Sequence, residues 1–136
     1  MPEARIPRAA PIRHFTDLVV WQKAFELVLR VFELSKIWPR EERYALTEQV
    51  RRSSRSVSAN ISEAWGKRRY EAHFISKLTD ADGELLETEN WLMFAKSHSY
   101  LAAKDSDGLH SLMREIGPML GSILRNPGPF LLRDAR

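Results

Sequence analysis

The sequence predicts an all-α protein, an antiparallel up-down four-helix bundle. In four separate segments apolar residues recur three and four residues apart, and no segment alternates apolar and polar residues with a period of two. A length of 136 residues suits one domain, and four helices with short connections pack as an antiparallel bundle. We place the bundle at residues 16–124, after a flexible arm at 1–15 that holds three of the seven prolines and before a C-terminal tail at 125–136.

The first helix is expected from about Thr16 to Ile37. Thr16 is a candidate N-cap, with Asp17 favourably placed in the first turn. Pro39 disfavours helix at the residue before it and so sets the end. Its predicted core stripe is Leu18, Trp21, Phe25, Leu29 and Phe32.

The second helix is expected from about Glu41 to Trp65, with Gly66 as its stop. Ser53 and Ser54 take the place of one apolar turn, and such small residues let a neighbouring helix approach closely. Its predicted core stripe is Leu46, Val50, Val57, Ile61 and Ala64.

The third and fourth helices follow the same periodicity. The third runs from about Tyr70 to Ser97, and Gly83 inside it predicts close packing, because a mid-helix glycine costs about 1 kcal/mol against alanine. The fourth is expected to start at a cap, Ser106, and to kink at Gly117-Pro118. The predicted stripes are Phe74, Ile75, Leu78, Leu85, Leu86 and Leu92, and then Leu109, Leu112, Met113, Ile116, Leu120, Ile123 and Leu124.

Further apolar residues lie off the chosen stripes. A monomeric bundle does not need a second apolar face, so these residues predict a homo-oligomer. They are Val19, Val28, Val31, Trp65, Trp91 and Met93.

Composition excludes several kinds of chemistry. The chain has no cysteine, which removes disulfides, thiolate metal sites and cysteine nucleophiles. No run approaches the ~18 apolar residues of a membrane span, and residues 1–15 lack the apolar core of a secretory signal. We therefore expect no membrane association and a cytoplasmic location.

The sequence carries none of the familiar catalytic, metal-binding or cofactor-binding motifs. The four histidines form no HExxH pair. A di-iron bundle needs Glu-x-x-His on two helices, and the nearest approach here is a single Asp107-x-x-His110. The acidic run 80–84 lacks the glycine and glutamate positions of a calcium loop. No glycine-rich phosphate loop or nucleophile elbow is present. We predict no metal, no cofactor and no enzymatic activity.

Charge is unevenly distributed along the chain. The net charge is only +3, but residues 51–69 hold six basic residues against one acidic, and residues 71–89 hold six acidic against one basic. Arginine binds phosphate through its planar fork, so the basic segment is a candidate nucleic-acid interface. Alternatively, the acidic third helix neutralises it, within the chain or in a neighbouring subunit. The basic residues are Arg51, Arg52, Arg55, Lys67, Arg68 and Arg69.

The second helix also carries a family resemblance. Its paired Arg51-Arg52, the serine-rich turn after them and the run Ser56-x-x-x-Asn60-Ile61-x-Glu63 resemble the signature of a bacterial four-helix-bundle family. That family includes the proteins encoded in 23S ribosomal RNA intervening sequences, and one branch contains accessory variability determinant proteins of diversity-generating retroelements. The start at Asp17-Leu18-x-x-Trp21 and the third-helix run from Ala81 to Glu89 are similar to the family pattern.

The resemblance implies a non-catalytic bundle, assembled as a ring-shaped homopentamer, with RNA and protein as candidate partners. It gives a structural role to Asn60, Glu63, Gly83 and Glu87. Asn60 is expected to bond the end of a neighbouring helix and Glu63 to pair with Arg52 or Arg55, since such contacts specify register. Two functions stay open: an oligomeric scaffold that binds structured RNA or a nucleoprotein complex, and a protein-interaction module without nucleic-acid affinity. An enzyme is the least favoured class.

Overall fold

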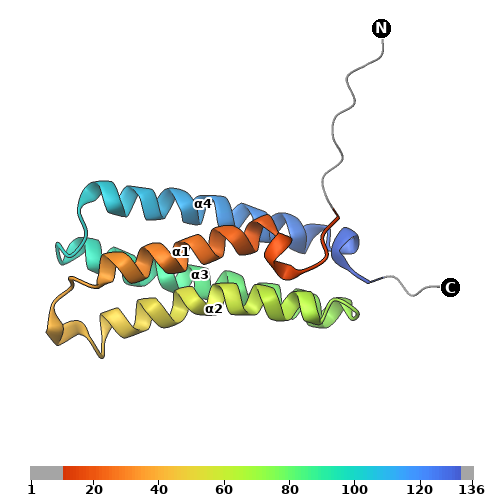
Figure 1. The fold of residues 1–136 in the computed structure, drawn as a ribbon, viewed down its shortest axis with the longest axis horizontal. Helices are drawn as coiled ribbons and strands as arrows, with labels where there is room; N and C mark the ends of the chain where they lie inside the picture. The colour runs from red at the N-terminus through yellow and green to blue at the C-terminus, as the bar shows by residue number, and fades with distance from the viewer. Residues whose placement is uncertain (1–10, 133–136) are drawn as a thin grey trace, which may run out of the picture.

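The computed structural model describes residues 11–132 and contains four long helices with no strand in that range. They are α1 (Val19–Ser35), α2 (Leu46–Gly66), α3 (Glu71–Ser97) and α4 (Ala103–Arg125), and each runs opposite to the one before it (Figure 1). Three short 3-10 turns flank them: η1 (Phe15–Asp17), η2 (Arg40–Glu42) and η3 (Gly128–Phe130). The predicted up-down four-helix bundle is confirmed. Most of the predicted arm, residues 1–10, lies outside the described residues, as do residues 133–136.

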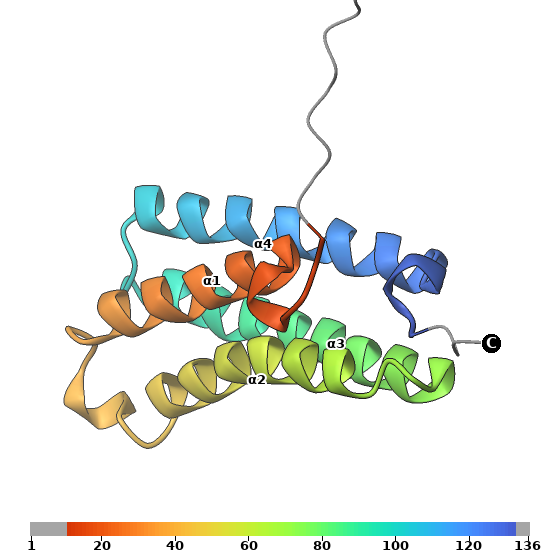
Figure 2. The ribbon, with the colours of Figure 1, turned by 45° about the vertical axis from the view of Figure 1, so that its right-hand side comes forward.

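The helices close into a ring of neighbours. Each helix packs against the next in sequence, and α1 also packs on α4, with α2 and α3 in the most extensive contact (Figure 2). Small residues explain the α2–α3 approach. Ser53 and Ser54 of α2 are fully buried, and the hydroxyl of Thr88 on α3 donates to Ser53 Oγ at 2.8 Å. The predicted close approach at these serines is confirmed.

The register of α1 differs from the prediction. The predicted stripe leaves Phe25 43% and Leu29 50% exposed, whereas the core takes Val20, Ala24, Leu27 and Val31. Val31, predicted to lie off the stripe, is 1% exposed. Because α1 is apolar around most of its circumference, two faces satisfy the same periodicity. The buried face is the one with smaller side chains, which lets α1 approach its neighbours.

Helix starts also differ from the predictions. Thr16 is not the N-cap of α1: His14 caps η1, and Leu18 precedes the first residue of α1. The second helix starts at Leu46 rather than near Glu41, because η2 and a short link occupy the intervening residues. Ser106 does not cap α4, which starts at Ala103 and continues through Pro118.

The other predicted stripes form most of the core. All five apolar positions of α2 are buried, as are Phe74, Leu78, Leu85 and Leu92 of α3, while Leu86 is 60% exposed. The residues after α4, as far as Leu132, pack on the end of the bundle. Phe130 stacks on Phe74, and the amide of Leu132 donates to the carbonyl of Arg68.

Candidate nucleic-acid interface

An open groove runs along the outer face of α2, at the end of the bundle near the α1–α2 connection. Its volume is about 550 Å³, and its lining contains four arginines and one carboxylate, that of Glu48. The lining residues are Arg43, Tyr44, Thr47, Glu48, Arg51, Arg52, Arg55, Ser56 and Ala59. We call this concavity the arginine groove.

The amphipathic pattern of α2 creates this groove. Burial of Val50, Val57 and Ile61 turns the opposite side of the helix outward. Arg51 and Arg55 lie one turn apart on that side, as their spacing predicts. Arg43 comes from the link before α2 and was not among the predicted site residues. A sequence signal existed, because Arg43 falls inside the predicted second helix, about two turns before Arg51.

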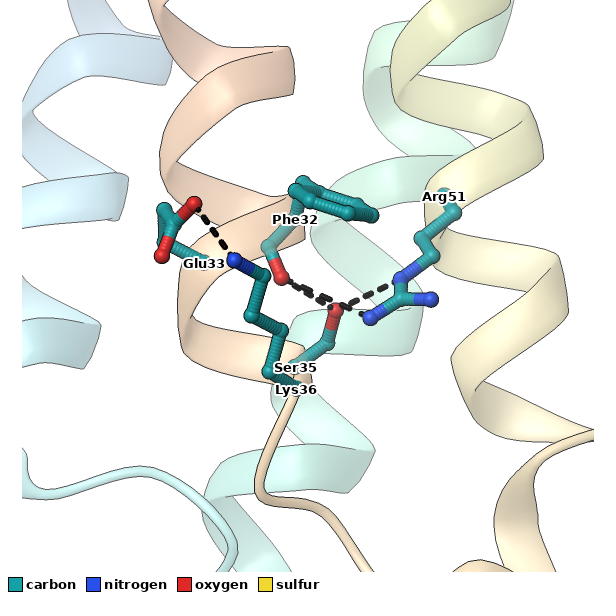
Figure 3. A network of polar contacts seen from close by, with 5 residues as sticks. All are labelled: Phe32, Glu33, Ser35, Lys36 and Arg51. Atoms are coloured by element: carbon teal, nitrogen blue, oxygen red, sulfur yellow. Dashed lines mark hydrogen bonds and ion pairs between the residues drawn. The ribbon is translucent and has the colours of Figure 1, made fainter.

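Arg51 lines the groove and also contacts α1. Figure 3 shows its polar contacts with Ser35 and Phe32. Its Nε donates to Ser35 Oγ at 2.8 Å and its Nη2 to the carbonyl of Phe32 at 3.4 Å. The guanidinium carbon lies 4.7 Å from the centroid of the Phe32 ring. Lys36 also lies over that ring, at 4.9 Å, and pairs with Glu33 at 2.9 Å. Arg51 thus ties the start of α2 to the last turn of α1, where carbonyls lack helical partners.

Arg52 faces the acidic helix. It lines a small polar cavity of about 160 Å³ with Glu84 and Glu87 of α3. Burial raises the pKa of Glu84, and the neighbouring Glu87 carboxylate raises it further, while the positive charge of Arg52 opposes both. The acidic helix therefore offsets part of the charge of Arg52, as the alternative interpretation of the basic segment anticipates.

Arg55 is the least engaged of the predicted cations in the groove. Its side chain is exposed, and no ion pair involves it among residues 11–132. A charge in this position keeps its hydration and is available to an anionic ligand.

The structure separates the other three predicted cations from the groove. Lys67, Arg68 and Arg69 follow α2 at its opposite end, and Lys67 lies about 18 Å along the axis from Arg55. Arg68 is held by Trp65, since its guanidinium stacks on the indole at 3.7 Å and donates to the Trp65 carbonyl. Lys67 and Arg69 are exposed. The six predicted residues thus form two groups, one on α2 and one just beyond its C-terminal end.

Two predicted structural contacts need correction. The side-chain amide of Asn60 donates to the Ser56 carbonyl of its own helix at 2.9 Å, not to a neighbouring helix of the chain. Glu63 pairs with Lys77 of α3 at 3.0 Å. Neither Arg52 nor Arg55 lies within reach of Glu63 in the same chain, because each is at least two turns away along α2. This pairing raises the pKa of Lys77, chiefly through the hydrogen bond to Glu63.

The prediction for Gly83 is wrong within the chain. Gly83 is exposed, and a Cβ built on it meets no atom within 4 Å. It therefore marks no close approach between helices of this bundle. Glu87, also exposed, accepts a hydrogen bond from Trp91 Nε1 at 3.3 Å.

No helix among the described residues is long and apolar enough to cross a membrane. Residues 11–132 also contain no group of three or more His, Asp or Glu side chains arranged to hold a metal ion.

The fold and the groove define a small all-α bundle with a basic outer face on α2. The family model for the 23S rRNA-intervening sequence protein matches residues 16–122, so the chain belongs to this family. A crystal structure from Bacteroides thetaiotaomicron VPI-5482, described as a protein with unknown function from the S23 ribosomal protein family, is similar to it. The two share 32% identity over 79% of this chain and 96% of that one, with a TM-score of 0.72. No curated protein matches the chain.

Proposed function

We propose that this protein is a non-catalytic oligomeric scaffold that binds structured RNA, or a nucleoprotein complex, through the arginine groove. One observation carries the proposal: four arginines line a single open groove together with one carboxylate. A groove of this charge attracts a phosphate backbone, and each guanidinium can bind two phosphate oxygens.

The arginines of the groove have different roles in this proposal. Arg55 is exposed and contributes fully to binding, whereas Glu84 and Glu87 weaken the contribution of Arg52. Arg51 uses two of its donors to hold α1 and keeps the others for a ligand. Arg55 is therefore the residue that tests the groove without disturbing the bundle.

The test is binding of the purified, nuclease-treated protein to a stem-loop RNA across a salt series. We expect the log–log slope to fall by about 0.7–0.9 in Arg55→Ala, the share of one phosphate contact. Arg114→Ala is the matched control, because Arg114 is an exposed arginine on α4 outside the groove. Equal slopes for both variants and the wild type contradict the proposal, and so does absence of binding at low salt.

An exposed stripe on α3 supports the oligomeric part of the proposal. Eight uncharged residues alternate at spacings of four and three, which is the pattern of a helix that packs on another helix. Gly83 and its small neighbours would let a helix of a second copy come close, while Leu86 and Met93 are 60% and 66% exposed. The stripe is Ala72, Ser76, Thr79, Gly83, Leu86, Asn90, Met93 and Ser97.

Light scattering tests this assembly. A pentamer gives five times the chain mass of 15.8 kDa, and Leu86→Glu is expected to dissociate it, because the stripe would then bury a charge. Leu29→Glu is the control, since Leu29 is similarly exposed on a different helix. A wild-type mass of 15.8 kDa at micromolar concentration refutes the assembly.

The second candidate is a protein-interaction module without nucleic-acid affinity. It is favoured by the unburied apolar face of α1, where Val19, Phe25 and Leu29 are 54%, 43% and 50% exposed. Absence of RNA binding with an intact fold would favour it over the scaffold.

A further inference from the structure

Tyr44 lies in the arginine groove with its ring open to solvent. It belongs to the short link between η2 and α2, and its side chain is 80% exposed. Among the described large hydrophobic residues only Ile37 is more exposed, at 87%, and Ile37 does not line the groove. Packing within the bundle therefore gives no reason for an aromatic ring at this position.

The surroundings of Tyr44 combine positive charge with an aromatic face. The guanidinium carbon of Arg43 lies 5.5 Å from the centroid of the Tyr44 ring. Arg51, Arg52 and Arg55 follow along α2 in the same groove. Proteins that bind single-stranded nucleic acids use this combination, in which cations follow the phosphates and aromatic rings stack on bases.

We propose that the groove takes an unpaired nucleotide, with Tyr44 stacked on the base and Arg43, Arg52 and Arg55 on the flanking phosphates. The inference rests on the proposed function and narrows its ligand from structured RNA in general to an RNA with accessible bases. Within a duplex both faces of a base are covered by its neighbours, so a flat side chain reaches only bases in loops, bulges and ends.

The dimensions of the groove agree with this assignment. From Thr47 to Ala59 its floor follows α2 for about 18 Å, which accommodates a short stretch of backbone. Tyr44 precedes Thr47 at one end of that floor. A strand could place its unpaired base on Tyr44 and continue past Arg51 and Arg55. Glu48 lines the groove between Tyr44 and Arg51, and its negative charge disfavours a phosphate group at that point.

Tyr70 provides the internal comparison. It is 61% exposed and follows Lys67, Arg68 and Arg69, but it lies at the opposite end of α2, and its ring packs beside His73 at 5.6 Å. It does not line the arginine groove. Tyr70→Ala therefore removes an exposed tyrosine beside basic residues and leaves the groove intact.

The experiment measures affinity for two RNAs of equal length, a stem-loop with unpaired bases and a blunt duplex without them. We expect Tyr44→Ala to weaken stem-loop binding roughly 5- to 100-fold, as loss of one stacked base does. The salt slope should not change, because the ring carries no charge. Tyr44→Trp should retain the affinity and Tyr44→Leu should not, since leucine has no π face. Tyr70→Ala should match the wild type, and circular dichroism verifies that every variant is folded.

The outcomes separate the two proposals. If the wild type binds neither RNA, the proposed function fails and this inference fails with it. If the stem-loop binds with a slope that depends on Arg55 while Tyr44→Ala binds as the wild type does, the groove holds phosphate alone and the inference is overturned. An equal loss for stem-loop and duplex also overturns it, because Tyr44 would then not distinguish unpaired bases.

Discussion

Replacement of Arg51 by alanine is expected to loosen the joint between α1 and α2. The change removes a hydrogen bond of 2.8 Å to Ser35 Oγ, a longer one of 3.4 Å to the Phe32 carbonyl, and the cation over the Phe32 ring. A hydrogen bond to a charged group is worth about 1.5–3 kcal/mol, and a partly exposed cation–π contact about 0.5–1 kcal/mol. Ser35 still donates to the Phe32 carbonyl, so no buried donor is left unpaired.

We therefore expect Arg51→Ala to lower the free energy of unfolding by about 2–4 kcal/mol. At about 3–6 °C per kcal/mol for a domain of this size, the melting temperature falls by roughly 6–24 °C. Urea unfolding followed by circular dichroism and by tryptophan fluorescence measures the change. The stability of Arg51→Lys should lie between those of the wild type and Arg51→Ala, because lysine keeps the positive charge but lacks the planar guanidinium fork.

Arg55→Ala is the matched control, since Arg55 is exposed on the same helix and an exposed arginine without contacts changes stability by at most about 0.5 kcal/mol. A double-mutant cycle with Ser35→Ala should give a coupling energy of at least about 0.5 kcal/mol, as expected for residues in contact. Equal stability of Arg51→Ala and Arg55→Ala would falsify the reasoning, because the contacts of Arg51 would then contribute nothing.

Three further perturbations have definite expected results. In the Leu86→Glu chain, where the proposed assembly is dissociated, Gly83→Ala should raise the free energy of unfolding by about 0.5–1 kcal/mol, because the site is helical and has space for a Cβ within the chain; a lower urea midpoint contradicts this. Ser53→Leu should lower the free energy of unfolding by about 1–3 kcal/mol, because the larger side chain overpacks the α2–α3 contact beside Thr88. An unchanged urea midpoint would contradict the close packing of Ser53 against Thr88. The amides of Arg13 and His14 hold the pKa of Asp17 below its usual range. The stability that Asp17 contributes is therefore present above its ordinary pKa and is lost as pH falls through its pKa in the folded protein. In acid, the free energy of unfolding of Asp17→Asn should therefore fall less than that of the wild type.

The second helix was the most predictable part of the fold. Its apolar positions are few and its other faces are polar, so only one orientation buries an apolar stripe. The first helix offered two apolar faces, and periodicity chose the wrong one. The 3-10 turns η1 and η2 shifted the predicted helix starts, because Thr16 and Glu41 satisfy local preferences that the chain uses in turns instead.

The candidate site, like the fold, was predictable only in part. The spacing of Arg51 and Arg55 placed them on one face, and the structure agrees. Arg43 and Tyr44 were missed because the predicted basic segment began at Arg51; both reach the groove from the link before α2, which the prediction treated as the first turn of the helix. The assignments of Asn60 and Glu63 failed because they named partners on the basis of charge and polarity alone.

The sequence by itself determined that four amphipathic helices form, which face of α2 is buried and where its arginines emerge. Each of these follows from contacts between residues three and four apart, which the chain carries locally. Only the tertiary structure decided which of those charges are occupied: Arg51 by α1, Arg68 by Trp65, and Arg52 in part by α3, while Arg55 is left exposed. Pairing across helices depends on the rotation and axial position of each helix against its neighbours, and those are set by how side chains of different size pack in the core.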